Sequence, residues 1–356
     1  MMPVRTADSL QAFVEAHLVD VSSALDSYVT AAMLEIPAAG GDYRALWQSL
    51  GGEFDGGKNL RPSLTLAAYA GLGGDDPAAV VPVAAAMEML HTAMLVHDDI
   101  LDHDEVRRGR LNVAGTRRAA LSQSGLNQDQ VEDHVQAAAL LGGDLALSSA
   151  YDLVSRASLP AHHRIACLDL ITGAIRATIA GELLDMYANV TPPQEAKSLL
   201  IAELKTATYS FVVPLHAGAQ LAGADPTMVG HLDKIGTALG LSFQLVDDDL
   251  GVFGDSSVTG KSVLSDLRAG KRTELLRRGF ELADPAGLEV LTQCVGNPSL
   301  TEDDAARART VLQECGARKK ALDVARHHAR LARRLSVERV SAPLSGYLGQ
   351  LIDVLE

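Results

Sequence analysis

Apolar residues recur along this chain with the spacing of helices rather than of strands. Between residues 8 and 34 they return every three or four positions, beginning with Leu10, Phe13 and Val14. A period of about 3.6 residues places these side chains on one face, which predicts an amphipathic helix over that range. Pro37 predicts that the helix has ended.

The same period dominates the rest of the sequence. No stretch of useful length alternates apolar and polar residues as a half-buried strand does, and we find no repeat of fixed period or low-complexity linker. We therefore predict an all-α fold, a single large helical-bundle domain spanning residues 1–356. Further helices are predicted over residues 43–50, 63–72, 78 to the aspartates at 98–102, 129–157, 161–188, 193–221 and 225–252, with two or three more over 301–355.

Composition narrows the class of protein. The 356 residues are 47% hydrophobic but only 4% aromatic, which favours helices over a β-sandwich or barrel. The formal net charge of −14 argues against a nucleic-acid partner, because nucleic-acid binders usually carry a basic excess. Cys167, Cys294 and Cys315 lack the spacing of a zinc site, so we expect three reduced thiols.

No membrane-spanning segment is expected. The first ten residues lack a basic region followed by an apolar run, so we predict no signal peptide. The most apolar stretch, residues 78–90, is interrupted by Pro82 and Glu88 and is shorter than the roughly 20 residues that span a bilayer. We expect a soluble protein located in the cytoplasm.

Two aspartate-rich stretches follow apolar helical patterns. The first contains Asp98, Asp99 and Asp102, and the second contains Asp247 and Asp248. Carboxylates are rarely buried unless they meet cations or metals. Two such clusters at helix ends predict facing walls of one polar pocket that holds hard divalent cations. Oxygen ligands that leave much of the shell to water and phosphate are typical of Mg²⁺.

Helix geometry sharpens the first cluster. Asp98 and Asp102 are four residues apart, so they lie on one face with Met94 one turn below. Like charges at this spacing repel, and carboxylates are disfavoured at a helix C-terminus. The alternative is an acidic, solvated helix end, but the local conflict is typical of a functional site.

Two pairs of basic residues predict anion binding. Lys58 and Arg61 follow glycines at the start of a helix, where backbone N–H groups also attract anions. Arg107 and Arg108 follow the first aspartate cluster. Alone, each pair is typical of solvated charges. Together with metal-binding carboxylates, they predict two anionic sites, one held through metal and one held directly by Lys and Arg.

From about residue 56 to residue 273, the chain resembles the trans-isoprenyl diphosphate synthases of the polyprenyl synthetase family. Several motifs of this family occur in its order, which makes a chance resemblance improbable. They are Gly56-Gly57-Lys58-Asn59-Leu60-Arg61-Pro62; Glu88-Met89-Leu90-His91-Thr92; Asp98-Asp99-Ile100-Leu101-Asp102 with Arg107-Arg108-Gly109; Gly143-Asp144; Gly181-Glu182-Leu183-Leu184-Asp185; Lys205-Thr206; Phe243-Gln244 with Asp247 and Asp248; and Gly260-Lys261 followed by Asp266-Leu267-Arg268-Ala269-Gly270-Lys271.

The resemblance implies a helical bundle of the isoprenoid synthase type with a central active-site cavity. It implies an Mg²⁺-dependent head-to-tail condensation of isopentenyl diphosphate with an allylic diphosphate to an all-trans prenyl diphosphate, in a homodimer. About three Mg²⁺ ions would lie between Asp98, Asp102 and Asp247, with Asp248 near them. Asp99 completes the first motif.

The resemblance also assigns the other site residues. Lys205, Lys261 and Arg107 would contact the allylic diphosphate, and Thr206 and Gln244 would line the reacting carbons. Lys58, Arg61, His91 and Arg108 would hold isopentenyl diphosphate, and Lys271 would contribute to substrate binding.

Two positions depart from the family pattern. The second aspartate motif often ends in an aspartate at the position of Gly251, and Glu182 stands where the family has glutamine. Because metal contact in the family is expected mainly from the position of Asp247, we expect activity to survive. The missing carboxylate at Gly251 would affect the groups that surround the metal and its direct ligands, and so the affinity for the metal.

Product length should depend on the residues below Asp98. Relatives that stop at farnesyl usually carry an aromatic residue four or five positions before that aspartate, where this chain has Met94 and Ala93. Leu90 lies about one turn deeper. We therefore expect geranylgeranyl diphosphate, with longer polyprenyl products as the alternative.

Other functions fit the motifs less well. A class I terpene cyclase shares the first motif but has no use for a second diphosphate site at Lys58 and Arg61. A phosphohydrolase built on His97-Asp98 would leave the basic motifs unexplained. A catalytically silent regulatory subunit usually lacks one acidic motif, whereas here the first is intact and the second nearly so.

Overall fold

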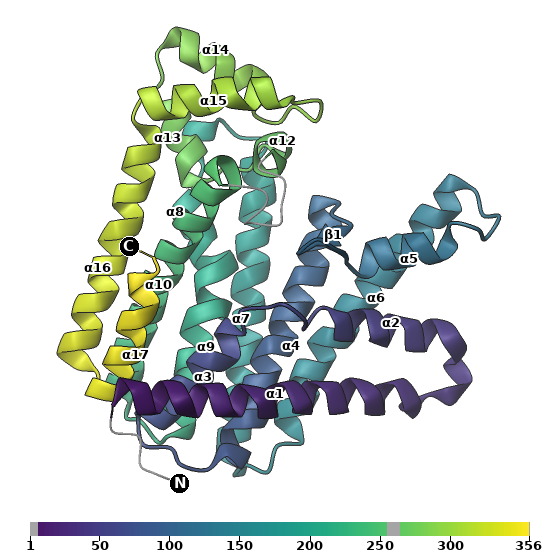
Figure 1. Ribbon diagram of the computed structural model, residues 1–356, viewed down its shortest axis with the longest axis vertical. Coiled ribbons are helices and arrows are strands. Elements are labelled where there is room, and N and C mark those ends of the chain that lie inside the picture. Colours follow the sequence, from purple (N-terminus) through teal and green to yellow (C-terminus); the bar gives the residue numbers. More distant parts are fainter. Residues whose placement is uncertain (1–5, 255–263, 356) are drawn as a thin grey trace. The chain divides into compact units, whose positions relative to one another are not determined.

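The computed structural model describes residues 6–254 and 264–355, which are almost entirely helical, and this confirms the all-α prediction (Figure 1). Its contacts gather into two compact units. Unit 1 comprises Met1–Thr172 and Pro214–Asp225, and unit 2 comprises Gly173–Val213 and Pro226–Glu356. One domain over residues 1–356 stays a prediction.

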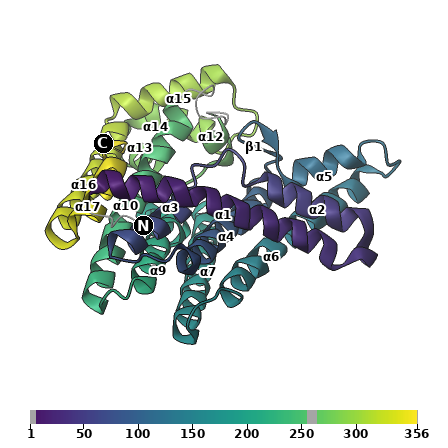
Figure 2. The same cartoon turned by 60° about the horizontal axis from the view of Figure 1, so that its bottom comes forward.

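Unit 1 is built around one apolar helix, α4, which packs against α1, α3 and α6. In two views of the chain, α4 and α6 run side by side (Figures 1 and 2). The elements of this unit are α1 (Ala7–Glu35), η1 (Pro37–Ala39), α2 (Gly40–Gly52), α3 (Leu60–Gly71), α4 (Pro77–Asp102), β1 (Val106–Arg107), β2 (Arg110–Leu111), α5 (Val113–Leu121), α6 (Gln128–Ser155), the first part of α7 (Ala161–Ala188) and most of α9 (Val213–Leu221).

The sequence determines both ends of α4. The Asp76 side chain accepts a hydrogen bond from the Ala78 backbone N–H, and Pro77 occupies the first turn, where a missing N–H has no consequence. His103 ends the helix in the left-handed conformation. Every residue from 83 to 93 is buried, Glu88 and His91 included, so this part of the helix forms the core of the unit.

Helix α4 is also long and apolar enough to cross a membrane by length and composition. Its 26 residues continue well beyond the apolar stretch at residues 78–90. However, 78% of its most apolar window is buried inside the structure, which is typical of a core helix.

Unit 2 packs around α10, which contacts η3 and α16 most extensively. The elements of this unit are the second part of α7, η2 (Pro193–Glu195), α8 (Ser198–Ala202), the π-helix η3 (Glu203–Val212), α10 (Pro226–Phe253), α12 (Ser265–Ala269), α13 (Glu274–Leu282), α14 (Pro285–Cys294), α15 (Glu302–Glu314), α16 (Ala317–Arg339) and α17 (Ala342–Asp353).

Small residues bring the helices of unit 2 close together. A Cβ atom added at Gly240 would overlap Ala207 of η3, and one at Gly236 would lie 2.9 Å from the Cα atom of Val212. On α16, the buried positions include Ala321, Ala325 and Ala329, four residues apart. These positions allow η3 and α16 to lie against α10 with little space between the backbones.

The structure corrects the predicted helix over residues 193–221. This stretch is η2, α8, the π-helix η3 and α9 in succession, not one regular helix. A π-helix has i→i+5 hydrogen bonds and a longer period than an α-helix, but the ten residues of η3 are too few to tell the two periods apart. Helices α5, α12, α13 and α14 were also missed, although α13 is strongly amphipathic. The strands β1 and β2 have two residues each and are too short to give a period.

Candidate functional site

The first aspartate motif occupies the last turn of α4. The Asp98 side chain is 23% exposed, and Asp102, one turn further on, is also partly exposed. Met94, one turn before Asp98, is partly exposed too, whereas Ala93 and Leu90 are fully buried. The three residues that spacing places on one face, Met94, Asp98 and Asp102, are therefore all partly accessible to solvent.

Asp99 plays a different part from its neighbours, because it is buried and paired. Arg107 donates from Nε to Asp99 Oδ1 at 3.0 Å, with a second bond from Nη2. Asn112 donates from Nδ2 to Asp99 Oδ2 at 2.8 Å and to the backbone carbonyl of Asp104 at 2.7 Å. Burial raises the pKa of Asp99, and the bonds from Arg107 and Asn112 oppose that rise. Asp99 thus anchors Arg107, and sequence reasoning missed Asn112.

Arg107 also reaches the accessible part of the motif. Its Nη2 lies 3.4 Å from Asp98 Oδ2. Burial alone would lower the pKa of Arg107, but the hydrogen bond and charge of Asp99 raise it, so the guanidinium stays charged. A fixed cation therefore stands beside Asp98.

The Arg-Arg-Gly motif is the turn of a tight hairpin. Val106 pairs with Leu111, and Arg107 pairs with Arg110, so Arg108 and Gly109 form the two-residue turn. Both have positive φ, 53° and 72°, as a type I′ turn requires. Glycine adopts this conformation at no steric cost, whereas a long side chain seldom does, which marks Arg108 as a functional position.

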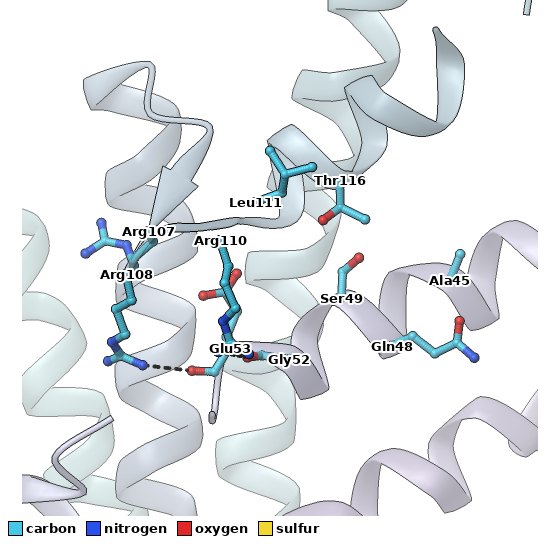
Figure 3. A pocket seen from close by; sticks show the side chains of 10 residues that line it. All are labelled: Ala45, Gln48, Ser49, Gly52, Glu53, Arg107, Arg108, Arg110, Leu111 and Thr116. Atoms are coloured by element: carbon cyan, nitrogen blue, oxygen red, sulfur yellow. Dashed lines mark hydrogen bonds between the residues drawn. The ribbon is translucent and has the colours of Figure 1, made fainter. Parts of the chain in front are cut away.

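Arg108 is directed toward the end of α2. Its Nη1 donates to the backbone carbonyls of Glu53 and Asp55, each at 3.2 Å, and Figure 3 shows the bond to Glu53. The Gly57 backbone lies against the same guanidinium, because a Cβ atom added there would be 3.3 Å from Arg108 Nη1. The hairpin turn and the glycine loop before Lys58 therefore meet.

A cavity of about 310 Å³ opens between α2, the hairpin and α5 (Figure 3). Burial raises the pKa of Glu53 in its wall, as does the nearby Asp99 charge, while the arginines lower it. The lining residues are Ala45, Gln48, Ser49, Gly52, Glu53, Arg107, Arg108, Arg110, Leu111 and Thr116.

The cationic groups predicted to hold isopentenyl diphosphate act on one another in unit 1. Lys58 is exposed, and Asn59 begins α3 in the left-handed conformation, with Arg61 in the first turn. His91 is buried, and its pKa lies well below the usual value because of burial and then because of the charges of Arg61, Arg108 and Arg107. At neutral pH the imidazole is therefore uncharged.

Glu88, one turn before His91, was quoted in a sequence motif but given no role there. It is only 3% exposed, and burial raises its pKa, while the charges of Arg61 and Arg108 lower it. A buried carboxyl beside these arginines offsets part of their mutual repulsion.

The Gly143-Asp144 element supports the end of α4. A Cβ atom added at Gly143 would overlap the His97 ring, and His97 Nε2 lies 3.6 Å from Asp144 Oδ1. His97 therefore packs against α6, and glycine at 143 provides the room.

In unit 2, the Lys-Thr pair lies within the π-helix η3. π-Helical turns often occur at functional sites, where they redirect side chains. Lys205 Nζ lies 2.9 Å from Glu182 and 3.1 Å from Asp185. The Gly181 position lies against the backbone nitrogen of Lys205, since an added Cβ atom would be 2.6 Å away. Lys205 therefore has two carboxylate partners, because Glu182 stands where the family has a neutral glutamine.

The three aspartates at the end of α10 lie in different surroundings. Asp247 is exposed, whereas Asp249 is buried and receives two hydrogen bonds from Arg318 of α16, at 2.8 and 2.9 Å. Gln244 Nε2 donates to Asp248 Oδ1 at 2.8 Å. Burial raises the pKa of Asp248 well above its usual value, and Asp266 and Asp247 add to the rise.

Asp266 lies beside the departure from the second motif. A Cβ atom added at Gly251 would overlap the Asp266 carboxylate, whose Oδ1 lies 3.9 Å from Lys271 Nζ. The charge of Lys271 also lowers the pKa of Asp248. Lys271 is thus placed among the carboxylates of unit 2.

Thr206 and Lys261 were also predicted as site residues. Thr206 is partly exposed on η3 next to Lys205. Lys261 lies outside the described residues. In the described part of the chain, no group of three or more His, Cys, Asp or Glu side chains is placed to hold a metal by itself. The partly exposed carboxylates are oxygen donors that suit Mg²⁺ completed by water and phosphate.

Comparison with known proteins agrees with these motifs. Residues 48–312 match the family model Polyprenyl synthetase. The chain is 32% identical to a geranylgeranyl diphosphate synthase of Sulfolobus acidocaldarius over 262 residues, 73% of this chain and 74% of that protein. It is also 32% identical to a geranylfarnesyl diphosphate synthase of Aeropyrum pernix, over 84% of this chain and 90% of that protein.

Solved structures extend the likeness to nearly the whole fold. A geranylgeranyl pyrophosphate synthase from Corynebacterium glutamicum, complexed with isoprenyl diphosphate and magnesium, superposes with a TM-score of 0.89 at 28% identity. The match covers 97% of this chain and 98% of that one. The isoprenoid synthase fold is thereby confirmed, and the chain belongs to the polyprenyl synthetase family as a prenyltransferase.

Proposed function

We propose that this prenyltransferase condenses isopentenyl diphosphate with an allylic diphosphate and releases mainly all-trans geranylgeranyl diphosphate. The observation that carries the proposal is the cationic group of unit 1, where Arg61 and Arg108 act on a neutral, buried His91. Fixed guanidinium groups bind phosphate oxygens strongly, and a neutral imidazole can donate one hydrogen bond without adding charge.

The residues of this chain divide the work between two substrates. Lys58, Arg61 and Arg108 hold isopentenyl diphosphate, whose double bond attacks the allylic carbon. Lys205 contacts the departing diphosphate, and Thr206 and Gln244 line the reacting carbons. The proton lost from the new chain passes to the released diphosphate.

Asp98, Asp102 and Asp247 are the proposed Mg²⁺ ligands, with Asp248 near them and about three ions bound. The Corynebacterium glutamicum relative was solved with magnesium, and the oxygen donors here suit that ion. Bound Mg²⁺ would neutralise the diphosphate charge and so favour its departure. Arg107, fixed by Asp99 beside Asp98, adds a positive charge that needs no reorganisation.

The product length rests on Met94. This side chain is partly exposed on the face of Asp98, whereas Ala93 and Leu90 are buried in the core of unit 1. A flexible methionine at this depth leaves more room than an aromatic ring. The relatives in the comparison make products of different lengths, and the absence of an aromatic residue at 93 and 94 favours geranylgeranyl over farnesyl.

We also propose that the enzyme is a homodimer through α7. Within unit 2, this helix exposes an apolar stripe formed by Ile179, Leu183, Met186 and Tyr187, each more than half exposed. The spacing of three and four residues places them on one face. A continuous apolar stripe of this kind is typical of a protein–protein interface, and a second copy would cover it with the same stripe.

A product assay tests the proposal. Purified protein is incubated with Mg²⁺, labelled isopentenyl diphosphate and, in turn, dimethylallyl, geranyl and farnesyl diphosphate, and chain length is read by chromatography. We expect geranylgeranyl diphosphate from all three primers, and no product when Asp98→Asn replaces the wild type. Longer products would overturn the assigned length, and no condensation by folded protein would overturn the function. Sedimentation of wild type and Tyr187→Glu tests the dimer separately.

A further inference from the structure

Helix α16 reverses the charge of the chain. Its 23 residues carry eight Lys and Arg but only two Asp and Glu, in a protein whose formal net charge is −14. Segments of opposite sign to the rest of a protein create a local positive potential. We propose that the exposed face of α16 docks the enzyme on membrane surfaces that contain anionic lipids.

The basic residues lie on one face of the helix. Lys319, Arg326, Arg330 and Arg334 are exposed and follow each other at intervals of seven and four residues, with Lys320 beside them. At 1.5 Å per residue the stripe is about 22 Å long. We call these five residues the basic face.

The opposite side of α16 packs against α10, and its charged groups already have partners in the protein. Its buried positions are mainly alanines, and Arg318 is turned inward to Asp249. Arg333 pairs with Asp353 of α17 at 2.7 Å, and α17 runs beside α16 in both views (Figures 1 and 2). The arginines that serve the fold are therefore distinct from the basic face.

The two acids of α16, exposed Asp323 and Glu338, also lie along this face, but they balance only part of its five positive charges. Arg326 pairs with Asp323 at 3.1 Å, and both are exposed. Lys319, Lys320, Arg330 and Arg334 make no ion pair within the part of the chain that the structure describes. Arg326, Arg330 and Arg334 are four residues apart, where like charges destabilise a helix. An external anion would relieve that repulsion.

A bilayer surface is the anion that best fits this geometry. A straight row of cations matches a plane of phosphate headgroups, each Lys or Arg adding to the attraction. Val337 lies one turn beyond Arg334 on the same face and is 71% exposed, so an apolar group stands next to the cations. Val337 would enter the apolar boundary of a bilayer but would find only charged phosphates on a nucleic-acid backbone, which favours the bilayer. The inference does not depend on which prenyl diphosphate the enzyme makes.

Vesicle flotation tests the docking. The full chain is mixed with vesicles of phosphatidylcholine alone or with 30 mol% phosphatidylglycerol (an amount chosen on the order of natural anionic content). We expect binding only to the anionic vesicles, weakened by added salt. In the variant Lys319→Glu, Lys320→Glu, Arg330→Glu, Arg334→Glu, vesicle affinity should fall by at least about a hundredfold.

A matched control separates the face from the net charge. The variant Arg44→Glu, Lys197→Glu, Lys234→Glu, Arg307→Glu changes the charge equally at exposed positions outside α16, and it should float like the wild type. Helical content and turnover with water-soluble substrates check that both variants fold. Equal flotation of the two variants, equal binding to both vesicle types, or tighter binding of wild type to duplex DNA than to anionic vesicles would each overturn the proposal.

Discussion

The carboxylate of Asp266 occupies the space into which any side chain at Gly251 would have to project. The missing last aspartate of the second motif is therefore coupled to the position of α12. Gly251→Asp would bring the family pattern back but force one carboxylate against another, next to Asp248, whose pKa is already raised.

We accordingly expect Gly251→Asp to lower stability by roughly 1–3 kcal/mol, the usual cost of overpacking, without raising activity. Urea denaturation measures the change. The double variant Gly251→Asp, Asp266→Gly removes the overlap and should recover most of the loss. A single variant as stable as the wild type would show that α12 moves aside freely.

Asp99 and Asp102 should separate stability from chemistry. Asp99→Asn leaves buried Arg107 without its main counter-charge, and breaking such a pair costs about 3–5 kcal/mol. Asp102→Asn removes a partly exposed carboxylate and should change stability by less than about 1 kcal/mol. We expect the second variant to lose turnover while keeping its urea midpoint, and the first to lose both. Equal destabilisation of the two would contradict the anchoring role of Asp99.

His91 gives the unfolding free energy a defined pH dependence. Its pKa is well below 6.5 in the folded protein, because of burial and the neighbouring arginines. Below pH 6.5 the unfolded chain therefore binds a proton that the folded chain does not, so stability falls as pH falls. Well above pH 6.5 His91 is uncharged in both the folded and the unfolded chain, so it no longer makes the unfolding free energy depend on pH.

The check is urea denaturation of wild type and His91→Asn between pH 5 and 8 (roughly the range in which histidine titrates). The wild type should lose stability more steeply than the variant below pH 6.5, and the two curves should run parallel above it. Parallel curves over the whole range would mean that His91 titrates normally.

Part of this site could be predicted from the sequence, because it depends on residues that are only a few positions apart. Asp98 and Asp102 share a face through helix geometry, as their spacing predicts. The Arg108-Gly109 turn was not predicted, because positive φ is uncommon for arginine. The partners of Asp99 were not foreseeable in the same way. Asn112 reaches it from beyond the hairpin, so its role depends on where the chain folds back.

The interrupted helix over residues 193–221 shows a second limit. The apolar pattern of the ten residues of η3 does not distinguish a π-helix from an α-helix, and it does not reveal that Gly181 and Gly240 of other elements lie against η3. Likewise, a sequence with Asp247, Asp248 and Asp249 in a row does not reveal that the third is paired to Arg318. Tertiary contacts decide both features.

Met94 should control product length. Met94→Phe places a rigid ring one turn below Asp98, so products should shorten from geranylgeranyl toward farnesyl diphosphate. Met94→Leu, of similar volume, should leave the product unchanged. Chromatography of dephosphorylated products from each variant, with dimethylallyl diphosphate as primer, gives the distribution. A product range unchanged by phenylalanine would move the floor of the cavity to another residue.

Glu182 should weaken the hold of Lys205 on the allylic diphosphate. Lys205 lies between two carboxylates, at 2.9 and 3.1 Å, where the family pattern supplies one carboxylate and a neutral amide. In Glu182→Gln the remaining charge on the lysine is less compensated, so its attraction for phosphate increases. An ion pair that is partly exposed contributes up to about 1 kcal/mol, so KM for the allylic substrate should fall by roughly threefold to fivefold.

The matched variant for this test is Asp185→Asn, which removes the other carboxylate from the same lysine. Because both changes act on one ammonium group, each should lower KM for the allylic substrate while leaving KM for isopentenyl diphosphate unchanged. Steady-state kinetics with each substrate varied in turn gives both constants. If either variant shifts both KM values together, the effect lies in the packing of η3 against α7, and the charge balance at Lys205 does not govern substrate affinity.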